Sequence, residues 1–363
     1  FINGYYGIMD FDQPGSTDDT REVAHQEAEV QFTGSVTLDN GVEAGIFIQQ
    51  EVMGNNNTAG TADAQAVADE QYLYMKGSFG TLRLGQQDSA EYWSSAFGAQ
   101  AYAAGVPVNS GWTFFTASDG NNPGGGNAGN YDYAGGGFES PAYSTYGSQT
   151  DDSNGVLYMS PRVAGFQLSA SWHPNSGDSN NGTGGTINPV NDNNTENNAL
   201  AAGVNYSQDF QGIGVDASFG MSTEDRPAGV SDNGDPVYYT GGAAVSMAGF
   251  QFGGDVLIQD DGSLDTDGDG NFESNEGEAY ALGASYSTGP WTAGVNGIWS
   301  EIEGNVDRAG DDRRFAMTGG LDYAMGPGIT LSSSVLYEQF TTEEQGDGQS
   351  EYLAGLLGAT FSF

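Results

Sequence analysis

Two kinds of residue are scarce or missing in this chain: cysteine and the basic amino acids. None of the 363 residues is Cys, and 8 Lys and Arg stand against 49 Asp and Glu, which gives a formal net charge of −41. Without Cys there is no disulfide framework and no thiol chemistry. The lack of basic residues argues against nucleic acid as a partner, because phosphates bind to basic patches. The acidic excess favours cations instead.

Long apolar runs are also missing. No stretch approaches the roughly 18 apolar residues that a membrane-spanning helix requires. A polar chain with a high net charge would ordinarily be disordered, but 19 Tyr, 19 Phe and 5 Trp are too many aromatics for a solvated tail. Such a chain can still enter a membrane if its apolar residues all face one way, as they do in a transmembrane β-barrel.

Alternation of apolar and polar residues with a period of two recurs along the chain. In residues 22–38, for example, Val30 and Phe32 share one face while Gln31 and Thr33 share the other. About sixteen such segments follow one another, and short turns alternate with long polar loops, a pattern typical of outer-membrane barrels. The sequence therefore predicts an all-β fold: one transmembrane antiparallel β-barrel over residues 1–363, with short periplasmic turns and long extracellular loops.

Aromatic spacing within one predicted strand supports the membrane location. Trp291 and Trp299 share a face, and eight residues at about 3.3 Å each place them about 26 Å apart along the strand. Strand tilt reduces this to about 20 Å across the bilayer, close to the separation of the two aromatic girdles of membrane barrels. Phe315 and Tyr323 repeat the spacing on the next predicted strand.

One long stretch, residues 88–152, carries neither alternation nor a helical period. It is rich in Gly, Asn, Ser, Tyr and carboxylates. A segment of this length without regular structure is usually functional or disordered. Inside a barrel it can instead fold inward against the wall, where it would set the width and the charge of the bore.

Two motifs beside this stretch resemble those of a known family. Residues 79–86, Phe-Gly-Thr-Leu-Arg-Leu-Gly-Gln, are similar to the strand that enters the constriction loop of general diffusion porins. Residues 155–166 resemble the hairpin that follows that loop, and Phe363 matches the terminal Phe that serves as the family's barrel-assembly signal. The resemblance implies a homotrimer in the bacterial outer membrane, in contact with its lipid, that passes small hydrophilic solutes.

The polar faces and the long loop supply the candidate pore-lining residues. Where many porins of this type read Leu-Gly-Arg-Gln, this chain has Gln86 in place of the Arg. The residues predicted to line the constriction are Arg83, Asp88, Glu91, Asp119, Asp132, Glu139, Glu29, Arg314 and Asp322. Carboxylates dominate this set, and a ring dominated by carboxylates favours cations.

A metal-binding pattern lies elsewhere, in a predicted extracellular loop. Residues 265–276 fit D-x-[DN]-x-[DN]-G-x5-E without exception. Alternate carboxylates converge on a hard cation in such loops, and Gly270 permits the sharp turn between them. The sequence therefore predicts a structural calcium site in a loop between strands. Its expected ligands are Asp265, Asp267, Asp269, Asn271 and Glu276.

Two other functions remain open at this point. A substrate-specific channel could use an aromatic slide formed by Trp112, Phe114, Phe115, Tyr131 and Tyr133. A secreted calcium-binding β-rich adhesin would suit the Asp, Gly and Asn content, but it predicts a fixed short repeat and the sequence has none.

Catalysis has little support in the sequence. The only histidines are His25 and His173, which have no Cys to pair with, and no nucleophile elbow stands near either. We therefore expect no enzymatic activity.

Overall fold

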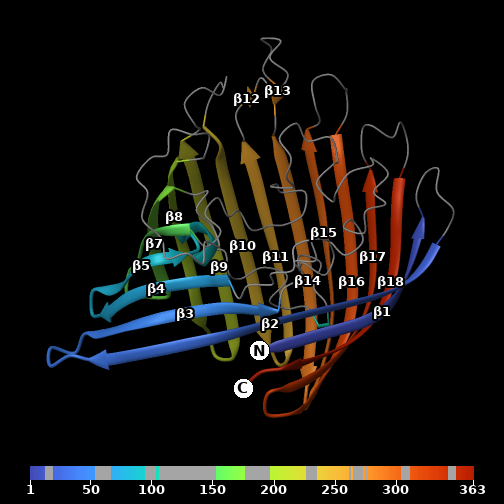
Figure 1. The fold of residues 1–363 in the computed structure, drawn as a ribbon, viewed down its shortest axis with the longest axis horizontal. Coiled ribbons are helices and arrows are strands. Elements are labelled where there is room, and N and C mark those ends of the chain that lie inside the picture. The colour runs from blue at the N-terminus through green and yellow to red at the C-terminus, as the bar shows by residue number, and fades with distance from the viewer. Residues whose placement is uncertain are drawn as a thin grey trace.

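A computed structural model describes most of the chain. The described residues are 1–12, 19–53, 67–94, 104–105, 153–175, 197–225, 235–260, 263–264, 273–274, 276–303, 311–341 and 349–363. Sixteen strands form one antiparallel sheet that closes on itself, and a separate two-stranded ribbon lies between β11 and β14 in the chain (Figure 1). The predicted barrel and its strand number are confirmed.

The elements have the following bounds. They are β1 (Ile2–Asp12), β2 (Asp19–Thr37), β3 (Glu43–Met53), β4 (Val67–Gly77), β5 (Gly80–Gln87), α1 (Ala90–Ser94), β6 (Ser153–Met159), β7 (Phe166–Asn175), β8 (Asn197–Asp209), β9 (Ile213–Asp225), β10 (Val237–Met247), β11 (Phe250–Asp260), β12 (Ser263–Leu264), β13 (Glu273–Ser274), β14 (Gly277–Thr288), β15 (Trp291–Glu303), β16 (Asp311–Gly326), β17 (Ile329–Thr341) and β18 (Gln349–Phe361).

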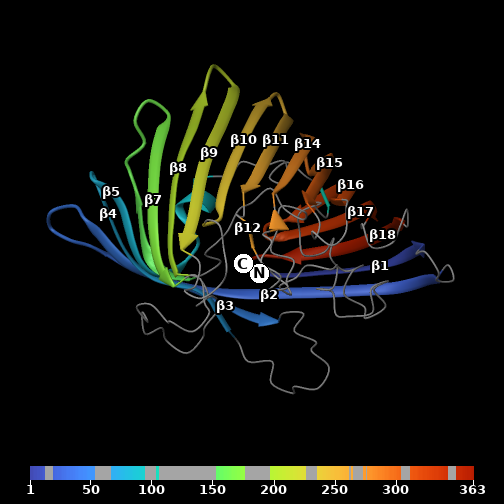
Figure 2. The ribbon, with the colours of Figure 1, turned by 90° about the horizontal axis from the view of Figure 1, so that it is seen from above.

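Barrel strands that follow one another in the chain pair with one another, and β1 closes the ring against β18, with Ile2 opposite Phe361. Seen from above, the strands surround the bore (Figure 2). Strand β5 ends at Gln87 and β6 begins at Ser153, the two positions that flank the predicted constriction loop. Among the described residues no helix is long and apolar enough to cross a membrane.

Alternation along each strand separates an apolar outer face from an inner one. On β16 the side chains of Phe315, Met317 and Leu321 are exposed on the outside, while Ala316 and Thr318 are buried on the inside. Because side chains alternate with a period of two, a slip of one residue would exchange the two faces. Each fully buried Leu or Met contributes about 1.5–3 kcal/mol through the hydrophobic effect. Lipid around the outer face would supply that burial.

Aromatic pairs mark both ends of the apolar band. The rings of Trp291 and Tyr323 lie 4.5 Å apart at one end of their strands. At the other end the ring of Trp299 lies 5.9 Å from that of Tyr280. Both pairs sit on the outer face, so the girdle arrangement expected from the spacing of the two tryptophans is present.

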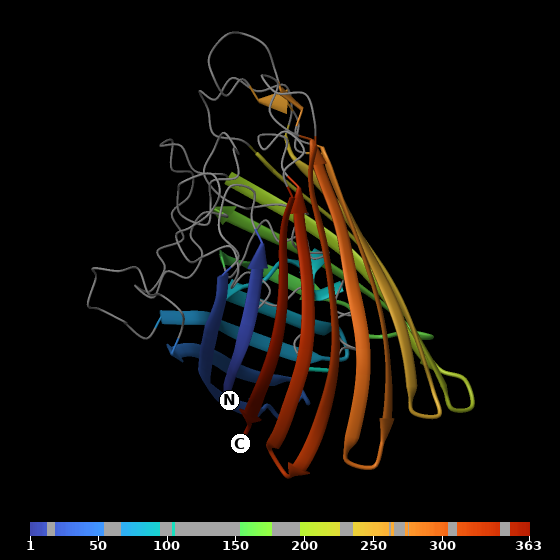
Figure 3. The ribbon, with the colours of Figure 1, turned by 90° about the vertical axis from the view of Figure 1, so that its right-hand side faces the viewer.

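Tight turns join several strand pairs at one end of the barrel (Figure 3). Between β10 and β11 the turn residues Ala248 and Gly249 have φ of 51° and 86°. Gln211 and Gly212 repeat this arrangement between β8 and β9, with φ of 58° and 88°. Two consecutive positive φ angles match the twist of a two-residue hairpin, and Gly adopts the second without strain.

Candidate pore constriction

The first part of the predicted constriction loop lies inside the barrel. Helix α1 packs against the inner wall of β7: the backbone N–H of Ala90 donates to Oγ of Ser171 at 2.9 Å, and the hydroxyl oxygens of Ser94 and Ser169 lie 2.6 Å apart. On β7 the neighbouring Leu168 is exposed on the outside, so the two serines of β7 face inward. The chain after β5 therefore turns into the bore.

A second contact of the loop lies on a different part of the wall. Ala104 and Gly105 lie against β15, β16 and β17, and the N–H of Gly105 donates to Oδ1 of Asp322 at 3.0 Å. Strands β8 and β16 are six steps apart around the ring. The loop thus touches two separated regions of the inner wall, which confirms the inward-folded constriction loop. The structure places Asp322, a predicted lining residue, as an acceptor that anchors this loop.

Arg83 joins the wall to α1. Its guanidinium carbon lies 4.5 Å from the ring centroid of Tyr72 on β4 and 4.3 Å from that of Trp93 on α1. The ring of Phe47 on β3 stacks on the ring of Tyr72, with their centroids 5.0 Å apart. Each cation–π contact contributes about 0.5–2 kcal/mol, more when desolvated. The buried carboxylate of Glu70 interacts electrostatically with Arg83. The positive charge of Arg83 is therefore partly balanced by a neighbouring side chain of the protein.

Arg314 and Glu91 were expected to line the constriction, and both are instead buried. Arg314 faces inward on β16 but is 1% exposed, and its Nε donates to Oε1 of Glu338 on β17 at 2.6 Å. Since Glu338 is 0% exposed, the pair carries no net charge into the bore. Glu91 is also 0% exposed, because α1 presses its side chain against β9 and β10 beside Gly220 and Thr240.

Partly exposed carboxylates remain on the inner face. They are Glu29, Glu43, Asp69, Asp216 and Asp255. Two amides lead to one of them, since Gln31 donates to Gln49 at 2.8 Å and Gln49 donates to Asp69 at 2.6 Å. Lys76, opposite Glu43 across β3 and β4, is exposed. The described inner wall therefore presents more carboxylates than basic groups.

Of the remaining predicted residues, some are described by the structure and others lie outside the described ranges. Asp88 is half-buried just before α1. The loop residues Asp119, Asp132 and Glu139 are outside the described ranges, as are the aromatic-slide residues Trp112, Phe114, Phe115, Tyr131 and Tyr133. The same holds for the expected calcium ligands Asp265, Asp267, Asp269 and Asn271, whereas Glu276 is described and exposed. Phe363 is fully exposed beyond β18.

The described residues do contain the base of the predicted calcium loop. Strands β12 and β13 pair antiparallel, with Leu264 opposite Glu273, so the chain on either side of residues 265–272 is held together. No group of three or more His, Asp or Glu that could hold a metal occurs within the described ranges.

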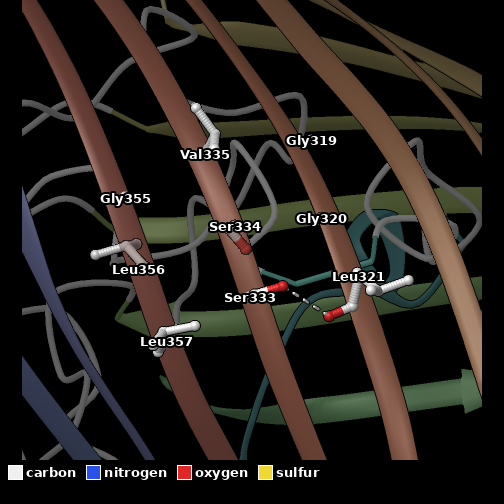
Figure 4. Close-up of a pocket in the computed structure, with 9 residues that line it drawn as sticks. All are labelled: Gly319, Gly320, Leu321, Ser333, Ser334, Val335, Gly355, Leu356 and Leu357. Atoms are coloured by element: carbon white, nitrogen blue, oxygen red, sulfur yellow. Dashed lines mark hydrogen bonds between the residues drawn. The ribbon is translucent and has the colours of Figure 1, made fainter.

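A shallow groove lies on the outer face of β16, β17 and β18, away from the bore (Figure 4). Gly319, Leu321, Val335, Gly355 and Leu357 are among the residues that line it. Leu321, Val335 and Leu357 are 41%, 59% and 68% exposed. These residues belong to the outward face of the strands, so the groove is not part of the pore.

Sequence reasoning missed three residues of the constriction: Tyr72, Trp93 and Glu338. A signal existed for Glu338, because counting outward from the turn between the predicted strands 315–323 and 329–337 brings it beside Arg314. Trp93 meets Arg83 only through the three-dimensional course of the loop, and no local pattern reports such a contact.

The fold and the site define a class of protein. A closed antiparallel barrel with an apolar outside, aromatic girdles at both ends and a loop seated across its interior is a transmembrane channel of the outer-membrane type. A family model described as "Gram-negative porin" matches residues 3–343. The chain belongs to the Gram-negative porin family, and its place is the bacterial outer membrane. The closed barrel gives no support to the secreted adhesin considered from the sequence.

Solved structures of a porin and of outer-membrane proteins from bacteria share the fold. An anion-selective porin from Comamonas acidovorans has a TM-score of 0.61 at 13% identity, with 99% of this chain and 98% of that chain covered. A loop L8 deletion mutant of OmpT from Vibrio cholerae has a TM-score of 0.57 at 12% identity, again with 99% and 98% covered. The trimer form of in-vitro folded OmpT from Vibrio cholerae has a TM-score of 0.54 at 11% identity, with the same shares covered. No curated protein matches this chain.

Proposed function

We propose that this porin is a passive, water-filled channel for ions and small hydrophilic solutes, and that it favours cations. The observation that supports this most is that carboxylates on the inner wall face water, whereas the inward arginines are held by other side chains. Glu29, Glu43 and Asp69 are partly exposed on the inner wall, whereas Arg83 lies between two aromatic rings and Arg314 is paired with Glu338. Carboxylates that face water in a narrow pore attract cations and repel anions.

The mechanism needs no catalytic chemistry. The inward loop restricts the bore and sieves solutes by size, while the carboxylates bias the field that an entering ion meets. Anion selectivity belongs to the Comamonas protein by its description, and at 13% identity the likeness supports the fold and not the charge of the pore. We expect no enzymatic activity.

Reversal potential in a planar lipid bilayer under a KCl gradient tests the proposal. Discrete conductance steps with a cation-selective potential are expected. Glu43→Gln combined with Asp69→Asn should shift the potential toward zero, because two inward charges are removed. Glu278→Gln is the matched control, since Glu278 lies on the outer face and accepts a hydrogen bond from Tyr280 at 2.7 Å. An anion-selective potential would overturn the charge assignment, and the absence of any step would overturn the channel.

We further propose a homotrimer, supported by an amide patch on the outer face. Gln50, Gln71 and Asn154 alternate outward on β3, β4 and β6 and are partly exposed, and Gln71 donates at 3.0 Å to Gln86 of β5, which is itself 1% exposed. Amides that face hydrocarbon are unfavourable, and β5 and β6, with 8 and 7 residues, are the shortest barrel strands. A second copy of the chain would cover this surface. Unheated, detergent-solubilised protein should migrate as a trimer on a native gel; a monomer would contradict the proposal.

We also propose that residues 265–276 bind calcium. The sequence pattern supports this, together with the β12–β13 ribbon that closes the loop at its base. Extracellular sites of this kind bind with Kd of about 10⁻⁴–10⁻³ M. Calorimetric titration of the refolded protein with CaCl₂ should show this site, and Glu276→Gln should abolish it because the closing carboxylate is lost. Asp235→Asn, in a different loop, should leave it unchanged; equal binding by Glu276→Gln would refute the site.

A further inference from the structure

We propose that two pairs of glycines on the inner wall are the seats that hold the constriction loop across the bore. The first seat, Gly203 on β8 and Gly220 on β9, receives α1. A Cβ at Gly203 would lie 1.9 Å from Oγ of Ser94, and a Cβ at Gly220 would lie 2.7 Å from Cγ of Glu91. Real Cβ contacts are never this short, so α1 fits on the wall only because both positions lack a side chain.

The second seat, Gly294 on β15 and Gly320 on β16, receives Ala104 and Gly105. A Cβ at Gly320 would lie 1.8 Å from the carbonyl oxygen of Ala104, and one at Gly294 would lie 2.8 Å from its nitrogen. The N–H of Gly105 donates to Asp322, two residues along β16 from Gly320. The loop backbone is therefore pressed directly onto the strand backbone and fastened there by one hydrogen bond.

At Gly203 and Gly320 the three atoms nearest to a Cβ all belong to the loop, whereas at Gly220 and Gly294 a neighbouring strand is close as well, with Thr240 Oγ1 at 2.7 Å and the Ala284 carbonyl oxygen at 3.2 Å. Each of the four glycines lies inside a strand and none has the positive φ that favours Gly. Glycine in a strand interior weakens the strand and often marks a close approach of another backbone. Gly319, next to Gly320 but on the outer face, has no described atom within 4 Å of a Cβ built there. It is a glycine of the same strand that contacts no part of the loop.

Two seats on separated walls hold the two parts of the loop that the structure describes. Because β8–β9 and β15–β16 lie on different arcs of the ring, the segment between Ser94 and Ala104 has both ends held. The wall glycines are thus positioning residues that determine the open width of the pore, an inference that rests on the proposed channel function.

Gly320→Ala tests the second seat, with Gly319→Ala as its matched control. The new methyl group takes the place of the Ala104 carbonyl, so the loop leaves the wall and the Gly105–Asp322 bond is lost. In planar bilayers Gly320→Ala is expected to lose the single uniform conductance step of the wild type, whereas Gly319→Ala keeps it. The same uniform step in both variants would overturn the proposal.

A cysteine pair tests the first seat without measuring conductance. The chain has no Cys, and the hydroxyl oxygens of Ser94 and Ser169 are 2.6 Å apart, so Ser94→Cys with Ser169→Cys should form a disulfide in the oxidised, folded protein, detectable by mass after alkylation. Free thiols at both positions in folded protein would refute the seat. If the wild type conducts no ions while the cysteine variant still forms this disulfide, only the channel function is refuted.

Discussion

Two arginines of the inner wall show how a basic residue can lie in a pore without charging it. Arg314 is held by Glu338, with both side chains buried. Arg83 is held by aromatic rings from the wall and from α1. In each case a positive charge that would repel cations is held by neighbouring side chains. The partly exposed carboxylates therefore determine the electrostatic potential in the bore.

The buried ion pair predicts a large loss of stability when one partner is removed. Glu338→Ala leaves Arg314 as an uncompensated buried charge, so we expect the free energy of unfolding to fall by about 3–5 kcal/mol. Urea titration of the protein in lipid vesicles measures this change. Glu301→Ala is the control, because its partner Arg313 is 53% exposed and exposed pairs contribute about 0–1 kcal/mol. Equal losses in the two variants would contradict the assignment.

The stack around Arg83 predicts energetic coupling between two residues inside the barrel, Arg83 and Trp93. Arg83→Gln and Trp93→Leu should each destabilise the protein, and the double variant should lose less than their sum, by about 0.5–2 kcal/mol. Urea titrations of the wild type, the two single variants and the double variant give the double-mutant cycle that measures this coupling. Strictly additive losses would mean that the guanidinium and the indole do not support each other.

At the scale of elements, the strands were the most predictable feature. Alternation fixed which residues face outward, and the aromatic spacing of Trp291 and Trp299 located the membrane band. The ends were less predictable: β2 begins at Asp19 and not at residue 22, and β16 begins at Asp311 and not at residue 315. At these ends the strands continue beyond the apolar band. Their side chains there are polar on both faces, so the alternation of apolar and polar residues no longer indicates a strand.

The constriction loop was predictable in its limits but not in its contacts. Alternation stops at Gln87 and resumes near Ser153, so the boundaries were visible. Helix α1 has only five residues, too few to show a helical period. The burial of Arg314 depended on pairing with Glu338, and the placement of Glu91 depended on α1 meeting the far strands, which are contacts between residues distant in sequence.

Two faces of one sheet should respond differently to the same charge. Val295 lies on the outer face midway between Trp291 and Trp299 and is 48% exposed. Val295→Arg places a charge in hydrocarbon, so the free energy of folding into lipid vesicles should become less favourable by about 2–4 kcal/mol. Gln251→Arg, on the partly exposed inner face of β11, should change it little. A similar loss for both would mean that the assigned faces are wrong.

For the whole molecule, the net charge of −41 acts on ions through the summed electrostatic potential of many carboxylates, and not through one binding site. Such a field is screened over about 10 Å at 0.1 M salt and about 3 Å at 1 M. We therefore expect the cation preference, measured as the permeability ratio of K⁺ to Cl⁻ from reversal potentials, to fall as KCl rises at a constant gradient. A ratio that stays constant would point to a local binding site in place of the field.

The pairing of β1 with β18 has a kinetic consequence. Every other pair in the barrel joins strands that follow one another around the ring, and the most widely separated of these, β5 and β6, are connected through residues 88–152, whereas Ile2 meets Phe361 from almost the whole chain away. Long-range pairing is slow because the loop-closure entropy is lost before the contact forms. At this seam Tyr5 covers Gly358, where a Cβ would lie 2.1 Å from its ring. The ring therefore closes last, and until then both edges stay open to wrong partners.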